Sequence, residues 1–300
     1  MEWITGIQNA INYIEKNLDG KIDYDRAARE SFSSPHHFQR VFSILCGYTL
    51  GEYVRNRRLS LAGTELATGK EKVIDIAAKY GYESPDSFAK AFQKFHGITP
   101  SQARGGAQLR SFSPLSIKVT LEGGSIMNYR IEEKSAMLLT GYKRRFTGSP
   151  NDKQEQDHNF ACETRLEQYI LEGMCREHET IYQILTNFDA DGYDFYFAYQ
   201  FPSWALEDML EIPANIADRF ENVPIPAGTY IVFETERCEF PTAKMDELRT
   251  KAISEWLPTS GYELRDVPEI GVIHWYWEEG NEALNSSRYC ELWLPIVKKG

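Results

Sequence analysis

The spacing of apolar residues along the first third of the chain predicts helices. Apolar side chains recur at steps of three and four residues and so share one stripe of a helix expected over residues 3–18. Asp19-Gly20 is expected to end that helix. A longer helix is expected over residues 49–67, with Thr49 as its N-cap, and Gly63 is a position at which it could kink. The residues of the first stripe are Ile4, Ile7, Ile11, Ile14 and Leu18.

The same part of the chain contains a segment written twice, fifty residues apart. Each copy predicts two short helices, which occupy residues 24–46 in the first copy and 73–96 in the second. The second helix of each copy opens with Ser-Pro, an N-cap followed by a residue whose φ suits the first helical turn. Two Phe residues four positions apart then form a buried stripe, and a Gly ends the helix. The residues shared by the copies are Asp25/Asp75, Ala27/Ala77, Ala28/Ala78, Ser34/Ser84, Pro35/Pro85, Phe38/Phe88, Phe42/Phe92, Gly47/Gly97 and Thr49/Thr99.

Two consecutive short helices with a capped second helix are typical of helix-turn-helix proteins, which insert the second helix into the major groove of DNA. Two such units in one chain would contact successive groove segments, about 34 Å apart along one side of the duplex. We therefore predict an all-α domain of two helix-turn-helix units joined by a long helix, with double-stranded DNA as its partner. An all-helical bundle whose repeat is only architectural is the alternative.

The first copy has hydrogen-bond donors on its outward side. Phe38 and Phe42 face inward, so His36, Gln39 and Arg40 are expected on the opposite side of the second helix. Arg suits a bidentate pair with guanine and Gln suits one with adenine, and each gives about 1–3 kcal/mol of discrimination. We predict that these three residues contact base edges.

The second copy has fewer donors on the corresponding side, where Asp86, Ser87 and Lys90 are expected. Asp86 lies near a helix N-terminus, where a carboxylate stabilises the helix dipole but is repelled by DNA phosphate. We therefore expect the second unit to position the protein on DNA, with Lys90 and Lys94 near phosphates.

From residue 127 onwards, the pattern changes to that of strands. The expected order is strand, strand, helix, strand, strand, and this order occurs twice. Asp-Ala-Asp-Gly at residues 189–192 predicts a hairpin. The pattern indicates an α+β domain with an internal duplication, in which an antiparallel sheet carries two helices on one face. The expected strands are 129–133, 137–146, 181–188, 193–201, 219–223, 229–236, 269–277 and 288–297, and the expected helices are 159–171 and 242–257.

The last expected strand places a carboxylate beside an indole. Glu291 and Trp293 share one face because side chains alternate along a strand, and the other face is apolar. A buried carboxylate needs a partner, since burial without one is costly or raises its pKa. A ligand cation stacked on aromatic rings would be such a partner, and an internal ion pair with Arg130 or Arg288 is the alternative. The aromatic residues expected to line the same cleft are Tyr142, Tyr199, Trp204, Tyr230 and Trp275.

Length and charge divide the chain at the same place as the hydrophobic pattern. Three hundred residues suggest about two domains. The net charge is −11, but residues 1–108 carry +2 and residues 109–300 carry −13. A weakly positive DNA-binding domain must gather its cations on one face. Arg55, Arg57 and Arg58 on the long helix are expected to contact DNA phosphate or a neighbouring acidic surface.

Composition argues against several other classes of protein. No apolar run approaches the roughly 18 residues of a membrane span, and the chain start lacks the basic residues and cleavage site of a signal peptide. The five cysteines occur singly, without CxxC or His/Cys spacing. We expect reduced thiols in the cytoplasm, no metal site, no cofactor and no membrane partner.

Two stretches carry a family resemblance. SPHHFQRVFSILCGYTLGEYVRNRRLSLA and IDIAAKYGYESPDSFAKAFQKFHGITP resemble the AraC/XylS DNA-binding domain, over about residues 1–106. GTYIVFE and YCELWLPI resemble the gyrase-inhibitor-like effector-binding domain, over residues 126–300, which leaves residues 107–125 as a linker.

The resemblance implies a cytoplasmic transcription regulator that is not an enzyme. It implies that His36, Gln39 and Arg40 occupy base-reading positions, and that Glu291 matches the acidic residue of the family's ligand cleft. It also implies a small, lipophilic or cationic effector, and RNA polymerase is a further possible partner.

Three alternatives for the second domain stay open. It could act as a hydrolase in which Glu291 is a general base, it could bind a protein, or it could be a structural appendage. Two DNA-reading units in one chain allow either a monomer or a homodimer.

Overall fold

The computed structural model describes residues 2–31, 33–117, 127–175, 179–201 and 218–299. The chain divides into two compact units. The helical unit comprises Met1–Gln39 and Tyr48–Leu121, and the sheet unit comprises Arg40–Gly47 and Glu122–Gly300. The sheet unit therefore includes a short segment of the first helix-turn-helix. Each unit is described by itself.

The first seven helices of the described chain confirm the two predicted helix-turn-helix motifs. The first pair of helices begins and ends at the predicted residues 24 and 46, and the second pair at 73 and 96. The first helix of the chain ends three residues before the predicted Leu18, because turns begin at Lys16. The helices are α1 (Glu2–Glu15), α2 (Tyr24–Glu30), α3 (Pro35–Cys46), α4 (Leu50–Thr68), α5 (Val73–Lys79), α6 (Pro85–His96) and α7 (Pro100–Arg104).

The predicted caps are present. Thr49 forms a capping box with Glu52 at the start of α4, and the Ser84 hydroxyl accepts a hydrogen bond from the Ser87 amide at the start of α6. Gly97 ends α6 with a φ of 79°, a left-handed conformation that favours glycine. These contacts satisfy amide groups at helix ends that would otherwise lack partners.

Gly63 does not interrupt α4. The helix continues through it, and a Cβ atom at this position would lie 2.7 Å from the His96 ring. The glycine therefore permits a close approach between α4 and α6. The kink that the sequence allowed at this position is not present in α4. Phe88 and Phe92 pack with Leu59 in the core beside this contact.

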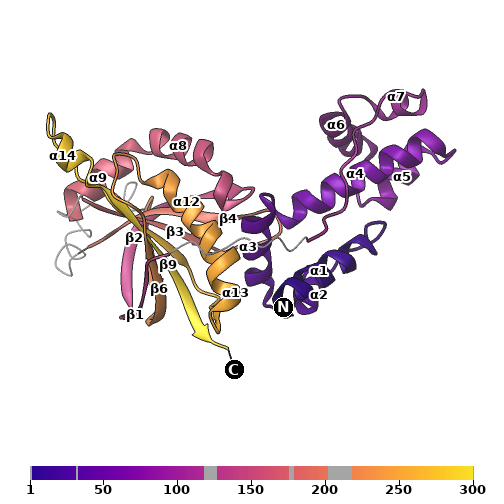
Figure 1. Ribbon diagram of the computed structural model, residues 1–300. Helices are drawn as coiled ribbons and strands as arrows, with labels where there is room; N and C mark the ends of the chain where they lie inside the picture. The colour runs from indigo at the N-terminus through magenta and orange to yellow at the C-terminus, as the bar shows by residue number, and fades with distance from the viewer. Residues whose placement is uncertain (1, 32, 118–126, 176–178, 202–217, 300) are drawn as a thin grey trace. The chain divides into compact units, whose positions relative to one another are not determined.

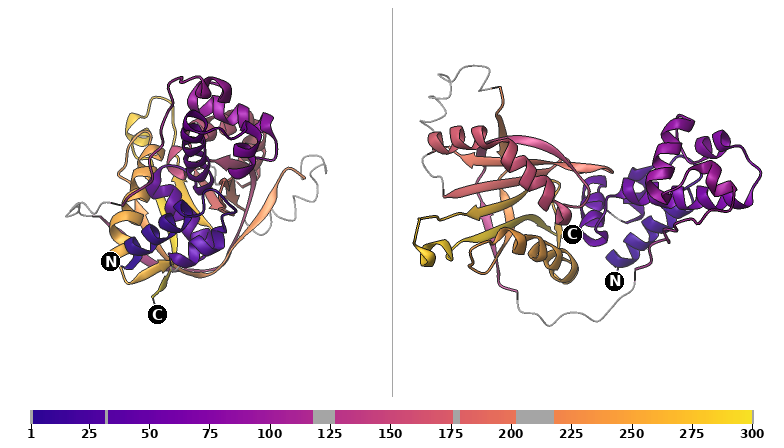
Figure 2. Two further views of the ribbon diagram at one scale, coloured as in Figure 1. Left: turned by 90° about the vertical axis from the view of Figure 1, so that its right-hand side faces the viewer. Right: turned by 90° about the horizontal axis from the view of Figure 1, so that it is seen from above.

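The sheet unit confirms the predicted α+β fold with internal duplication. Its strands pair in the order β1-β6-β9-β8-β3-β4-β2-β5, with β7 also paired to β9, and each of these pairings is antiparallel. Strands at opposite ends of the sheet run in clearly different directions (Figure 2). The strands are β1 (Tyr129–Lys134), β2 (Met137–Thr147), β3 (Thr180–Thr186), β4 (Gly192–Gln200), β5 (Glu221–Ile225), β6 (Gly228–Glu234), β7 (Tyr262–Leu264), β8 (Glu269–His274) and β9 (Tyr289–Lys298).

The two repeats exchange their first strands. In the first repeat β2, β4 and β3 lie side by side, and in the second β6, β9 and β8 do so. β1 precedes the first repeat in sequence but pairs with β6, whereas β5 precedes the second repeat but pairs with β2. Each repeat therefore completes the edge of the other.

The helices of the sheet unit differ in detail from the prediction. The single helix expected over 159–171 is two helices that meet at Thr164, and β5 lies two residues later than expected and includes Pro224. β7 and α14 (Glu282–Asn285) were not predicted. The other helices are η1 (Pro150–Asp152), α8 (Gln154–Glu163), α9 (Arg165–Cys175), α12 (Thr242–Lys251), the π-helical η3 (Ala252–Trp256) and α13 (Leu257–Thr259).

The two faces of the sheet carry different aromatic clusters. On the helical face, Phe146 and Phe195 pack against Phe160 of α8 and Leu171 of α9; Figure 1 shows α8 and α12 beside the sheet. On the opposite face, Tyr230 and Trp293 belong to a second buried cluster. A residue's position along its strand therefore decides which cluster it joins.

Candidate DNA-binding and effector-binding sites

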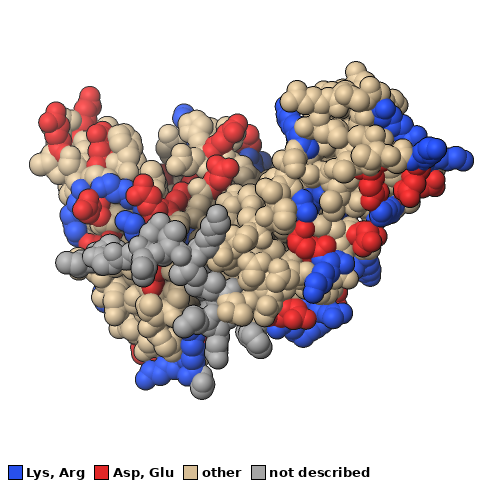
Figure 3. All heavy atoms as spheres, turned by 45° about the vertical axis from the view of Figure 1, so that its right-hand side comes forward, with Lys and Arg blue, Asp and Glu red and all other residues tan. Residues whose placement is uncertain are grey.

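The outward side of α6 is exposed, as the sequence predicts. Asp86, Ser87, Lys90 and Lys94 are all exposed. The Ser87 hydroxyl is part of the helix cap, where it donates to the Ser84 carbonyl at 2.8 Å. On the face drawn in Figure 3, Lys and Arg lie among Asp and Glu rather than forming one continuous basic patch. The cations available to DNA on that face are therefore interspersed with acidic residues.

The outward side of α3 is divided. His36 is exposed, but Gln39 is buried and Arg40 is only 4 % exposed. Arg40 belongs to the sheet unit, where its guanidinium forms an ion pair with the fully buried Glu269 of β8. In this conformation Arg40 is not available to a base edge.

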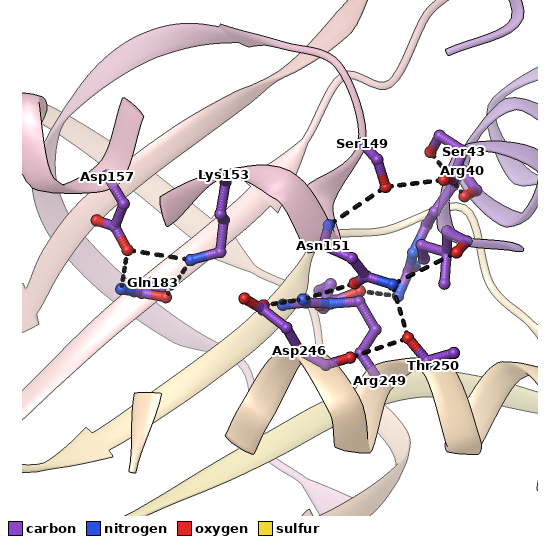
Figure 4. Close-up of polar contacts among 12 residues, drawn as sticks. Arg40, Ser43, Ser149, Asn151, Lys153, Asp157, Gln183, Asp246, Arg249 and Thr250 are labelled. Atoms are coloured by element: carbon purple, nitrogen blue, oxygen red, sulfur yellow. Dashed lines mark hydrogen bonds and ion pairs between the residues drawn. The ribbon is translucent and has the colours of Figure 1, made fainter. Parts of the chain in front are cut away.

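Arg40 and Glu269 are part of a buried network of two guanidinium groups and two carboxylates. Figure 4 shows Arg40, Arg249 and Asp246 of this network. Arg249 of α12 donates to Glu269 at 2.5 Å and to Asp246 at 2.6 Å. Burial alone would raise the pKa of Glu269, but Arg249 and Arg40 together hold it below its usual value. Burial lowers the pKa of Arg40, although the Glu269 carboxylate opposes this effect. The network is electrically balanced, so each charge depends on its partners.

Backbone carbonyl groups of α3 bind to the same region of the sheet unit (Figure 4). The Ser149 hydroxyl donates to the Ser43 carbonyl at 2.8 Å, and the Asn151 amide donates to the Ile44 carbonyl at 3.4 Å. Asn151 also donates to the Thr250 hydroxyl at 2.7 Å. Contacts from η1 therefore hold the last turns of α3 beside α12.

Two of the three arginines of α4, Arg57 and Arg58, make local contacts, whereas Arg55 is exposed. Arg57 pairs with Glu15 of α1 at 2.8 Å and also donates to the Phe112 carbonyl. Arg58 donates to the Leu18 carbonyl at 2.9 Å. For Arg57, the acidic partner expected from the sequence is thus a residue of the same unit.

Glu291 is 8 % exposed and has two strong partners inside the protein. Its carboxylate accepts hydrogen bonds from the Trp293 indole and from Arg130 of β1, both at 2.6 Å. Of the two internal partners considered from the sequence, Arg130 forms the pair. Arg288 instead donates to the carbonyl groups of Tyr276 and Glu239.

Trp293 also makes a cation–π contact with a lysine of the protein. The Lys134 ammonium lies 4.0 Å from the centre of the indole ring, and Tyr182 and Tyr230 make edge contacts with the same ring. The arrangement places a carboxylate and aromatic rings around a positive charge, which is the chemistry of a site for organic cations.

Three of the other predicted effector residues lie on the opposite face of the sheet from Glu291 and Trp293. Tyr142, Tyr199 and Trp275 line a cavity of about 580 Å³ on the helical face. Tyr230 shares the opposite face with Glu291 and Trp293, and Trp204 lies outside the described residues. The residues expected to line one cleft therefore lie in two groups, one on each face of the sheet.

The sequence reasoning did not identify Glu269 or Arg249. Glu269 begins an otherwise apolar strand, the same signal that singled out Glu291, so its burial could have been inferred. Arg249 lies on a helix with no clear apolar stripe, and its sequence neighbours give little indication that it is fully buried. Within the described part of the chain, no group of three metal-ligating side chains is close enough to hold an ion. No described helix is long and apolar enough to cross a bilayer.

The tandem helix-turn-helix and the duplicated α+β unit define a transcription regulator of the AraC type with an effector-binding domain. Residues 27–106 match the family described as helix-turn-helix domain. Residues 130–296 match the family described as integron-associated effector binding protein, and the chain belongs to that family.

Known regulators resemble the first part of the chain. The transcriptional activator AarP of Providencia stuartii is 44 % identical over 98 residues, which are 33 % of this chain and 73 % of that protein. The regulatory protein SoxS of Escherichia coli K12 is 38 % identical over 98 residues, covering 33 % of this chain and 92 % of SoxS.

A Vibrio cholerae integron cassette protein of known structure is 10 % identical and superposes with a TM-score of 0.37, covering 56 % of this chain and 95 % of that one.

Proposed function

We propose that the chain is a transcription regulator whose DNA binding responds to a small organic cation. The DNA-binding domain would comprise residues 1–106, with residues 107–125 as a linker and residues 126–300 as the effector-binding domain. The match to regulators such as SoxS supports the first role. The family match of residues 130–296 supports the second.

In the DNA complex, α3 and α6 would enter successive major-groove segments. Lys90 and Lys94, both exposed, would bind phosphates, and Asp86 and Ser87 would lie at the N-terminal end of α6 near the groove. His36, Gln39 and Arg40 would contact bases from α3. For Gln39 and Arg40 this requires a change from the conformation in which both are buried. Arg40 must also leave Glu269, because one guanidinium cannot hold that buried carboxylate and a base edge together.

The observation that carries the effector role is the buried Glu291 carboxylate beside Trp293. Arg130 and Lys134 show that this face of the sheet accommodates positive charge both on the carboxylate and over the indole. A lipophilic cation would replace these side chains, gaining ring contacts with Trp293, Tyr230 and Tyr182. The charged groups of Arg130 and Lys134 are at the ends of long side chains, which can turn outward to water.

Titration of the full chain with tetraphenylphosphonium, followed by tryptophan fluorescence, tests this site. We expect saturable binding that Glu291→Gln weakens by about tenfold, since a hydrogen-bonded or paired charge contributes on the order of 1.5 kcal/mol. Glu263→Gln, an exposed glutamate on β7, is the matched control. Equal affinity of wild type and Glu291→Gln would remove Glu291 from the site. Recovery of a chemically altered cation would instead support the hydrolase alternative.

A further inference from the structure

The cavity on the helical face is separate from the Glu291 site. It has a volume of about 580 Å³ and lies among α8, α9, α12 and the strands beneath them. Tyr142 and Tyr199 project into it from β2 and β4 and belong to the helical-face cluster. Trp293 belongs to the cluster on the other side of the sheet. A ligand in the cavity therefore cannot also contact Trp293.

The charged side chains that line the cavity differ in their hydrogen-bond and ion-pair partners. Lys153 is bound to Asp157 at 3.2 Å and to Gln183 at 3.1 Å (Figure 4). Asp246 is bound to Arg249 at 2.6 Å. Glu172 accepts a hydrogen bond from the Tyr199 hydroxyl at 3.1 Å, and no cation pairs with it among the described residues. Among the described residues, Glu172 is thus a carboxylate of the lining that is bound to a neutral hydroxyl and not to a cation.

The Tyr142 hydroxyl is a buried polar group near the same cavity. The side chain is only 4 % exposed, and no described residue makes a hydrogen bond of ordinary geometry with its hydroxyl. Buried hydroxyl groups are normally satisfied by protein, water or ligand. Tyr142 lines the cavity, but its hydroxyl lies beneath the lining beside Thr164 and Gln168. A bound molecule would reach it only if these side chains shift.

The walls of the cavity select for an aromatic or alicyclic body. Tyr199 and Trp275 lie on its lining together with Phe197 and Ile181, so rings and short aliphatic chains would find apolar surface. A volume of this size is in the range, roughly 300–1,000 Å³, of small-molecule sites.

We propose that this cavity binds a primary amine carrying an aromatic ring, with its ammonium group at Glu172 and its ring against Tyr199 and Trp275. The Tyr142 hydroxyl accepts a further hydrogen bond from the ammonium. The proposal rests on the proposed function of the sheet unit as a small-molecule sensor, and it assigns that unit a second site of different chemistry. An ammonium group donates hydrogen bonds, whereas a lipophilic cation such as tetraphenylphosphonium does not.

Isothermal titration of the full chain with 2-phenylethylamine at neutral pH tests the proposal. We expect saturable binding, and about tenfold weaker binding of the uncharged 2-phenylethanol. Glu172→Gln keeps an oxygen for the Tyr199 hydroxyl but removes the charge, and it should weaken amine binding about tenfold. Tyr142→Phe should weaken it several-fold while preserving the packed ring. Glu163→Gln, an exposed residue of α8, should leave the affinity unchanged.

A competition experiment separates this proposal from the proposed function. Saturating 2-phenylethylamine should leave the affinity for tetraphenylphosphonium unchanged, because the two sites lie on opposite faces of the sheet. Displacement of tetraphenylphosphonium, equal binding of the amine and the alcohol, or full affinity in both Glu172→Gln and Tyr142→Phe would overturn the amine site. So would the absence of amine binding while tetraphenylphosphonium still binds through Glu291, a result that leaves the proposed function intact.

Discussion

Arg40 of α3 forms a buried ion pair with Glu269 of β8, a residue 229 positions further along the chain. The pair places a predicted base-reading side chain inside the sheet unit. Glu269 also binds Arg249, which in turn binds Asp246 on the wall of the cavity. A continuous chain of charge-assisted hydrogen bonds therefore links the cavity to Arg40.

Replacing Glu269 with Gln should destabilise the sheet unit. The substitution leaves Arg40 and Arg249 buried with only one carboxylate between them, and breaking a buried pair in this way costs about 3–5 kcal/mol. Calorimetric unfolding of the full chain measures the effect. Glu263→Gln removes a carboxylate from an exposed position and should change the unfolding free energy by less than about 0.5 kcal/mol. Equal stability of the two variants would show that Arg40 does not depend on this carboxylate.

The proposed roles of Arg40 at a base and Lys90 at a phosphate predict different effects of replacing them. Arg40→Ala should relax the preference at one base position by about 1–3 kcal/mol. Lys90→Ala should weaken binding to all sequences alike and reduce the salt dependence by the equivalent of about one phosphate contact. Selection from random duplexes, followed by affinity measurements at several salt concentrations, distinguishes the two effects. A change in base preference caused by Lys90→Ala alone would reverse the assignment.

The sequence predicted local structure well because caps and apolar stripes act over a few residues. Thr49, Ser84 and Gly97 occupy the predicted ends of helices for this reason. The burial of Arg40 could not be predicted in the same way, since its partner lies in a distant strand and only the tertiary fold brings the two together.

The candidate effector residues show a related limit. Alternation along β9 correctly placed Glu291 and Trp293 on one face. Assigning Tyr142 and Tyr199 to the same cleft required the register of β2 with β4, and that register sets both on the helical face. The exchange of β1 and β5 between the repeats was also beyond local pattern, yet it brings Arg130 next to Glu291.

Gly63→Ala should destabilise the helical unit even though alanine favours helix. The new Cβ would lie 2.7 Å from the buried His96 ring, so α4 and α6 would have to separate. Overpacking of this kind costs about 1–3 kcal/mol. Gly173→Ala on α9 is the matched control, because no atom of the described residues lies within 4 Å of the position its Cβ would take, and it should stabilise its helix by about 0.5–1 kcal/mol. Thermal unfolding of both variants tests the contrast, and a stabilising Gly63→Ala would contradict the close approach.

His96 should make the stability of the helical unit depend on pH. Its Nε2 lies 2.9 Å from the Leu59 carbonyl and its Nδ1 lies 3.2 Å from the Arg110 amide, so the neutral ring donates at Nε2 and accepts at Nδ1. Burial lowers the pKa of His96, an effect that the Leu59 carbonyl opposes and Arg110 reinforces. Protonation would remove the acceptor used by Arg110.

Because the folded-state pKa of His96 lies below the unfolded value of about 6.5, the unfolded chain binds the proton more readily. The stabilising contribution of neutral His96 is therefore complete above the unfolded pKa and is lost as the pH falls through 6.5 toward the folded value. One proton can change the unfolding free energy by at most about 1.4 kcal/mol per pH unit. Denaturant unfolding of the full chain between pH 7 and pH 5, followed through the helical signal, should show this loss. His96→Gln should flatten the slope, and an unchanged slope in that variant would assign the pH dependence to other groups.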